Sequence, residues 1–179
     1  MRHFIYSISI LLTLVWVGCD GHDKEHTTEQ KTRIFPQYNP VLDEIIKKPE
    51  GTIRGIDLNT KAETIQTAEG MAPLESDSSY LYFEYKIDSV TDYSVTYNLQ
   101  HDTLDEIEVQ VNCTNLDLST KIFNDLKTYY EKKLPNPTED KGYVVYNCFE
   151  GQRKPFVVSL TDNSTPNKGI INLVIYRDK

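Results

Sequence analysis

The sequence lacks any cluster of lysine and arginine, and its 19 basic residues are outnumbered by 27 acidic ones, giving a formal charge of −8. Proteins that bind phosphate backbones need a basic face, so this composition argues against nucleic acid as a partner. The sequence also has no Gly-rich phosphate loop, no G-x-S-x-G turn and no CxxC pair. We therefore expect no enzymatic activity and no cofactor, and a hydrolase is the least favoured function that we consider.

A run of transmembrane length is also missing. The apolar run near the start of the sequence extends from Phe4 to Val17, about 14 residues, which is too short to cross a hydrocarbon core of roughly 30 Å as a helix. It follows the basic residue Arg2 and precedes the small residue Gly18, which is the pattern of a secretory signal peptide. We therefore expect residues 1–18 to be a signal peptide.

Gly18 is followed directly by Cys19. This order resembles the lipobox of bacterial lipoproteins, in which the cysteine thiol is lipidated and becomes the new N-terminus. The resemblance implies that Cys19 anchors the protein in the bacterial envelope, and the alternative is an ordinary signal peptide with a cysteine near its cleavage site. Asp20 and Asp23 resemble signals that send some lipoproteins to the outer membrane or the cell surface.

Only two cysteines remain beyond Cys19, at Cys113 and Cys148. An even pair in an oxidising compartment predicts a disulfide that closes a loop of about 35 residues. The alternative is two separate thiols buried in the core, which is an ordinary environment for cysteine.

Residues 19–48 are mostly polar and predict a tether, with a short helix at Val41–Lys48 that ends before Pro49. His22 to His26 spell H-x-x-E-H, an inverted zinc-protease motif. Zinc hydrolysis needs both imidazoles on a rigid helix and a third ligand, so in a solvated tether we reject this motif as a metal site. Residues 49–179 then form a single globular domain.

This domain contains a candidate internal repeat, because Ile56-Asp57-Leu58-Asn59-Thr60-Lys61 recurs as Leu116-Asp117-Leu118-Ser119-Thr120-Lys121. Each copy precedes a predicted helix. The first has Thr60 and Glu63 as a capping box and ends at Gly70, and the second spans Lys121–Leu134 with Ser119 or Asp117 as its N-cap and Pro135 as its end.

Three strand-like runs follow each helix. The clearest is Glu106–Cys113, where apolar and polar residues alternate with period two. The order predicts an α+β fold of tandem α-βββ repeats, 55–113 and 115–177, forming an antiparallel sheet with helices on one face. We expect Ile65 and Phe123 to be buried between helices and sheet.

This order is similar to the tandem repeats of the β-lactamase-inhibitor-protein-like fold, although the inhibitor has four strands in each repeat. The segment Gly55–Pro73 also resembles the opening of small outer-membrane assembly lipoproteins that are related to that fold. The resemblance implies a sheet with helices on one face, and it favours an inhibitor or immunity-type protein that blocks an envelope-acting enzyme as the alternative function.

The face without helices would carry Tyr80, Tyr82, Glu106 and Glu108. Exposed tyrosine offers contact area at a low entropic cost, although tyrosine is also simply common in strands. We expect a non-enzymatic binding or scaffold module that is held to the membrane by its lipid and recognises a protein or a cell-envelope glycan on this face.

Overall fold

Eight strands in one antiparallel sheet and three helices make up the part of the chain that this computed structural model describes, residues 32–134, 136–148 and 155–178. The helices are α1 (Pro40–Ile46), α2 (Ala62–Glu69) and α3 (Leu116–Lys133). The strands are β1 (Glu75–Ser76), β2 (Tyr80–Lys86), β3 (Thr91–Gln100), β4 (Thr103–Cys113), β5 (Thr138–Asp140), β6 (Tyr143–Cys148), β7 (Phe156–Asp162) and β8 (Gly169–Arg177). The predicted signal peptide, Cys19 and the first part of the tether lie outside the described residues.

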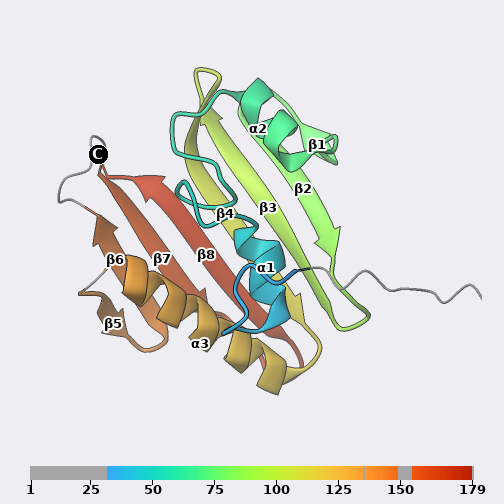
Figure 1. Cartoon of the computed structure of the whole chain (residues 1–179), viewed down its shortest axis with the longest axis vertical. Coiled ribbons are helices and arrows are strands. Elements are labelled where there is room, and N and C mark those ends of the chain that lie inside the picture. The colour runs from blue at the N-terminus through green and yellow to red at the C-terminus, as the bar shows by residue number, and fades with distance from the viewer. Residues whose placement is uncertain (1–31, 135, 149–154, 179) are drawn as a thin grey trace, which may run out of the picture. The chain divides into compact units, whose positions relative to one another are not determined.

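The strands lie in the order β1-β2-β3-β4-β8-β7-β6-β5. The sheet therefore consists of two four-stranded meanders joined where β4 pairs with β8, and each meander follows a helix (Figure 1). The α+β class and the antiparallel sheet are as predicted. The count of three strands in each half was wrong, because β1 and β5 were missed. Both strands are two or three residues long and fully exposed, so they show no apolar alternation.

The two copies of the six-residue motif also differ in structure. Ile56–Lys61 forms turns before α2, whereas Leu116–Lys121 forms the first turns of α3. Helix α3 thus begins five residues earlier than expected. Its N-cap is Asn115, whose side-chain oxygen accepts a hydrogen bond from the Leu118 N–H at 3.0 Å. Helix α2 ends at Gly70 as expected. Its N-cap is Lys61, and no side chain accepts a hydrogen bond from its first turn.

All three helices lie on one face of the sheet (Figure 1). Tyrosines that point from the sheet to this face contact each helix: Tyr93 donates a hydrogen bond to the Glu44 carbonyl of α1, Tyr97 to the Glu69 carboxylate of α2, and Tyr146 to the Lys127 carbonyl of α3. On β4, the residues that face the helices are buried, and the alternate residues are half-buried or exposed. The period-two pattern therefore predicted this strand and its orientation correctly.

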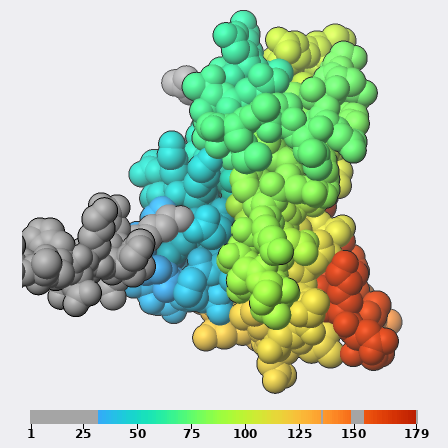
Figure 2. Space-filling model, turned by 90° about the vertical axis from the view of Figure 1, so that its right-hand side faces the viewer, coloured from blue at the N-terminus to red at the C-terminus, as the bar shows by residue number. Residues whose placement is uncertain are grey.

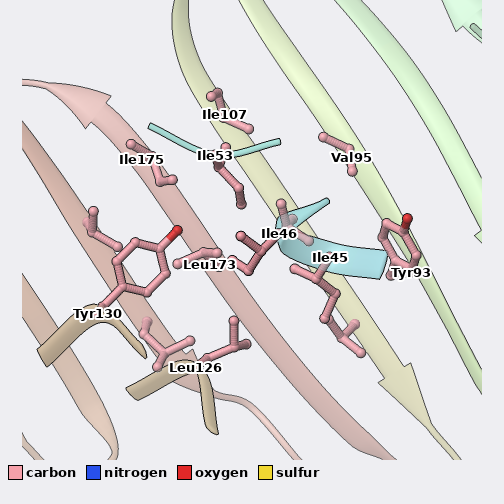
Figure 3. Packing of buried hydrophobic residues seen from close by; sticks show 14 of the residues in the cluster. Ile45, Ile46, Ile53, Tyr93, Val95, Ile107, Leu126, Tyr130, Leu173 and Ile175 are labelled. Atoms are coloured by element: carbon pink, nitrogen blue, oxygen red, sulfur yellow. The ribbon is translucent and has the colours of Figure 1, made fainter. Parts of the chain in front are cut away.

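The hydrophobic core lies between the helices and the sheet (Figure 3). Ile45 and Ile46 of α1 and Leu126 of α3 pack over Leu173 of β8, and all four are fully buried. Ile65 and Phe123 are buried as predicted, at 0% and 9% exposure. Because α1 contributes to this core, residues 32–48 belong to the compact folded unit and not to the predicted tether.

Helix α3 approaches β8 closely at Gly169. A Cβ atom at this position would lie 2.3 Å from the Cβ atom of Ser119, in the first turns of the helix. Any side chain at residue 169 would therefore push the helix away from the sheet.

Candidate functional site

The four predicted face residues lie on the side of the sheet opposite the helices. Tyr80 and Tyr82 are on β2, and Glu106 and Glu108 are on β4, with β3 between the two strands. The register forms two cross-strand rows: Tyr80, Asn98 and Glu106 in one, and Tyr82, Thr96 and Glu108 in the other. The structure therefore brings the four residues together. We call the exposed side of β2, β3 and β4 the open face.

Glu106 and Glu108 form a carboxylate pair on this face. The side-chain N–H groups of Asn98 donate to one oxygen of each carboxylate, both at 2.8 Å. Burial raises the pKa of Glu106, the hydrogen bond from Asn98 opposes the shift, and the neighbouring charge of Glu108 raises the pKa further. Two negative groups are thus held close together with one amide between them, an arrangement that favours the approach of a cation.

The two tyrosines are partly accessible and oriented by carboxylates. Tyr82 donates a hydrogen bond to Glu84 at 2.6 Å, and Tyr80 donates to Glu75 at 3.3 Å. The bond to Glu84, together with burial, raises the pKa of Tyr82, which keeps the hydroxyl protonated. The hydroxyl of each tyrosine is therefore held by a hydrogen bond, and because each side chain is only partly buried, part of each ring is available for contact.

A hollow of about 600 Å³ lies on the open face over β2, β3 and β4, and Tyr82 is the one of the four predicted residues that lines it. Its lining combines a tyrosine ring with amides and carboxylates: Tyr82, Glu84, Tyr85, Lys86, Asp92, Tyr93, Ser94, Gln110 and Asn112. Asn112 donates to Asp92 at 2.8 Å, and Gln110 donates to Asn112 at 3.2 Å. A hollow whose lining holds both a chain of hydrogen-bonded polar groups and an aromatic side chain can bind a neutral polar ligand as well as a protein surface.

A buried ionic cluster that no sequence pattern predicted lies on the other side of the sheet. Arg54, only 2% exposed, binds both oxygens of Glu69 at 2.7 Å and donates to the Glu44 carbonyl at 2.7 Å. Lys47 also donates to Glu69 at 3.0 Å. The local signals were an arginine between Ile53 and Ile56, and a glutamate directly before the glycine that ends α2.

Tyrosine rings enclose this cluster. Tyr85 and Tyr93 stack with centroids 4.7 Å apart, and the Arg54 guanidinium lies 4.8 Å from the centre of the Tyr85 ring. Tyr85 and Tyr97 both donate hydrogen bonds to Glu69. These tyrosines therefore connect α1, α2 and the sheet, and their role is structural.

The predicted disulfide between Cys113 and Cys148 was wrong. Both cysteines are free and buried. Cys113 pairs with Gly169 at one end of β8, whereas Cys148 pairs with Phe156, which pairs with Arg177 at the other end of β8. The length of a strand from residue 169 to 177 separates the two cysteines by about 27 Å. A disulfide needs Cα atoms within about 7 Å, so the fold excludes this bond.

We expect two reactive thiols, at Cys113 and Cys148, when the protein is denatured without reductant. In the folded protein both should react slowly, because burial hides them and raises the pKa of each thiol. Alkylation followed by peptide mass spectrometry measures both states. Labelling that appears only after reductant is added would contradict the structure.

No group of three or more histidine, cysteine, aspartate or glutamate side chains is placed to hold a metal ion in the described ranges. Among the helices of the described part, none is long and apolar enough to cross a membrane. Comparisons of the chain with protein-family models, with curated proteins and with solved structures find no significant match.

Proposed function

We propose that this protein is a lipid-anchored, non-enzymatic binding module of the bacterial envelope, whose partner docks on the open face. The observation that carries the proposal is the two-layer architecture. The described helices all pack on one side of the sheet, so the side that carries Tyr82 and the Glu106–Glu108 pair is left to solvent. An accessible sheet face with clustered charges can select a partner by complementary charge.

The charges of the open face favour a protein partner with a basic surface. Four carboxylates lie on this side of β2, β3 and β4, at Glu84, Asp92, Glu106 and Glu108, together with Lys86. Lysine or arginine side chains of a partner would relieve the repulsion between Glu106 and Glu108, and complementary charge accelerates association and selects the partner. An envelope-acting enzyme with such a surface would make the protein an inhibitor, which is the alternative function.

A cell-envelope glycan is the second candidate ligand. The lining of the hollow favours it, because Asn112, Gln110 and Asp92 present hydrogen-bonding groups in the same hollow as Tyr82. Sugar hydroxyls need such donors and acceptors, and a sugar ring can pack on an aromatic side chain.

We also propose that the two halves of the sheet, each with the helix before it, are tandem copies of one unit that has four strands and not the three predicted. The support is the order of elements, since α2 precedes β1 to β4 and α3 precedes β5 to β8. Joining two such units through β4 and β8 doubles the width of the sheet.

The open face is tested by capturing the intact lipoprotein from its own envelope. The double variant Glu106→Gln/Glu108→Gln should lose a basic protein partner while its melting temperature stays nearly unchanged. The matched control is Glu63→Gln/Glu131→Gln, which changes two exposed carboxylates on α2 and α3 by the same charge. Loss of the partner from the control but not from the face variant would refute the assignment.

The anchor is tested separately at Cys19. Its resemblance to a lipidated cysteine supports the expectation that Cys19→Ala abolishes acylation and releases the chain from the membrane fraction, because the acidic domain has no other attraction to lipid. Metabolic labelling with a fatty acid and fractionation of membranes measure both effects. Unchanged labelling and unchanged fractionation in the variant would rule out the lipid anchor.

A further inference from the structure

Half of β2 is an open strand edge. The edge strand β1 covers only Leu81 and Tyr82, which pair with Ser76 and Glu75. Residues 83–86 pair with β3 on one side and have no strand on the other side within the described part of the chain. Figure 2 is viewed towards this edge, and no other coloured segment lies in front of the middle of β2.

The hydrogen bonds around β1 show which backbone groups point outward. Leu74 donates its N–H to the Tyr82 carbonyl at 2.8 Å, and Asp77 donates to the Tyr80 carbonyl at 3.0 Å. Because backbone groups alternate in direction along a strand, Glu84 and Lys86 also present their N–H and C=O groups to the open edge. The backbone groups of Glu84 and Lys86 can therefore form hydrogen bonds with an added strand.

Apolar groups flank this edge on the helix side. Met71 and Leu74 are 45% and 61% exposed. A recess of about 400 Å³ opens beside Met71 and is lined by Glu44, Met71, Glu84, Tyr85, Lys86, Ile87 and Tyr93. An open strand edge with exposed apolar side chains next to it favours association with another strand.

We propose that β2 pairs with β2 of a second copy of this chain, antiparallel and around a two-fold axis at Tyr85. This register places Glu84 opposite Lys86 of the second copy, and Lys86 opposite Glu84. A lysine on an edge strand usually opposes pairing, but here the glutamate two residues earlier supplies its counter-charge, so the edge is complementary to itself. The closed two-fold pairing also ends the assembly at a dimer.

The geometry of an antiparallel ladder agrees with this register. Glu84 and Lys86 point their backbone groups outward, so they form hydrogen-bonded pairs across the axis, and Tyr85 forms the non-hydrogen-bonded pair between them. The helices of both copies then lie on the same side of one continuous sheet. Tyr85 and Ile87 line the recess of their own copy, so the two recesses adjoin across the axis, while Glu106 and Glu108 on both open faces stay uncovered. The dimer therefore does not rest on the partner proposed for the open face, although Glu84 and Lys86 lie at the border of that face.

Cysteine crosslinking of the full chain in its membrane tests the dimer. Chains with Glu84→Cys and chains with Lys86→Cys are expressed together and oxidised. Directly opposite residues of a hydrogen-bonded pair have Cα atoms about 5.5 Å apart, within the range of a disulfide. We expect a covalent dimer from the mixture and much less from either variant alone. Glu108→Cys, on the open face away from the edge, is the matched control.

A charge exchange tests the same register without cysteine. Glu84→Lys should weaken the dimer, and the double variant Glu84→Lys/Lys86→Glu should restore it, as measured by sedimentation of the full chain in detergent. No covalent dimer from the mixed cysteine chains, or equal crosslinking from Glu108→Cys, would overturn the proposal. So would a crosslink from Glu84→Cys to an extended segment of a different protein.

Discussion

Replacing Glu69 by alanine is expected to lower the free energy of unfolding by about 3–5 kcal/mol, because it leaves the buried Arg54 guanidinium without its partner. The side chains of Arg54 and Glu69 are almost fully buried, and the carboxylate accepts two hydrogen bonds from the guanidinium. Tyr85 and Tyr97 would lose their acceptor at the same time. Denaturant unfolding followed by circular dichroism measures the change.

The double variant Arg54→Met/Glu69→Leu separates the charge from the packing. Apolar side chains of similar size often replace a buried ion pair with little loss of stability. We therefore expect the double variant to be clearly more stable than Glu69→Ala. If Glu69→Ala alone costs less than about 1 kcal/mol, the cluster does not connect the helices to the sheet in the way that the structure indicates.

The same cluster predicts how stability depends on pH. Burial opposes the charge of Glu69, but the hydrogen bonds and the charge of Arg54 outweigh it and lower the pKa of Glu69 from 4.5 to about 2. A carboxyl whose pKa is lower in the folded state stabilises the protein above its unfolded pKa, and this stabilisation is lost as the pH falls from 4.5 towards 2. The difference in stability between the wild type and Glu69→Ala should therefore be smaller at pH 3 than at pH 6.

The second large effect is expected at Phe123 of α3. Truncation to alanine should cost about 3–5 kcal/mol, because it removes a buried aromatic ring and leaves a cavity between helix and sheet. Since small domains are stabilised by only about 5–15 kcal/mol, such a loss brings the protein close to unfolding. Thermal and denaturant unfolding measure the change.

Leu116 provides the control on the same helix. It is 39% exposed, compared with 9% for Phe123, so Leu116→Ala should change stability by less than about 1 kcal/mol. Equal losses at both positions would mean that α3 does not pack on the sheet through its Phe123 side.

Local sequence patterns predicted the elements that have one solvent-exposed side and one buried side. β4 is the clearest case, because Glu106 to Cys113 alternate with period two and the open and buried faces follow directly from that alternation. Gly70 was recognised as the end of α2 because a left-handed residue without a Cβ ends helices readily, and its φ angle is 73°. The four open-face residues were found by the same alternation.

Other features depend on contacts that no local pattern contains. The Arg54–Glu69 pair joins a turn to a helix end, and single charged residues at such places look like ordinary surface residues. The Cys113–Cys148 bond was expected from an even count of cysteines. Only the strand register shows that Cys113 on β4 is level with one end of β8 and Cys148 on β6 is level with the other end. The short strands β1 and β5 exist because they pair with β2 and β6, and their own residues are exposed and polar.

The central position of β8 has a consequence for folding kinetics. The ladder between β4 and β8 joins residues on the order of 60 positions apart in the chain, whereas successive strands within each meander are close together in the sequence. The two meanders can form quickly from local contacts, but their union requires the slow closure of a long loop. Until β8 arrives, the edge of β4 is unpaired and available to other chains, so the step from two meanders to one sheet is the stage at which this protein is most prone to misassembly.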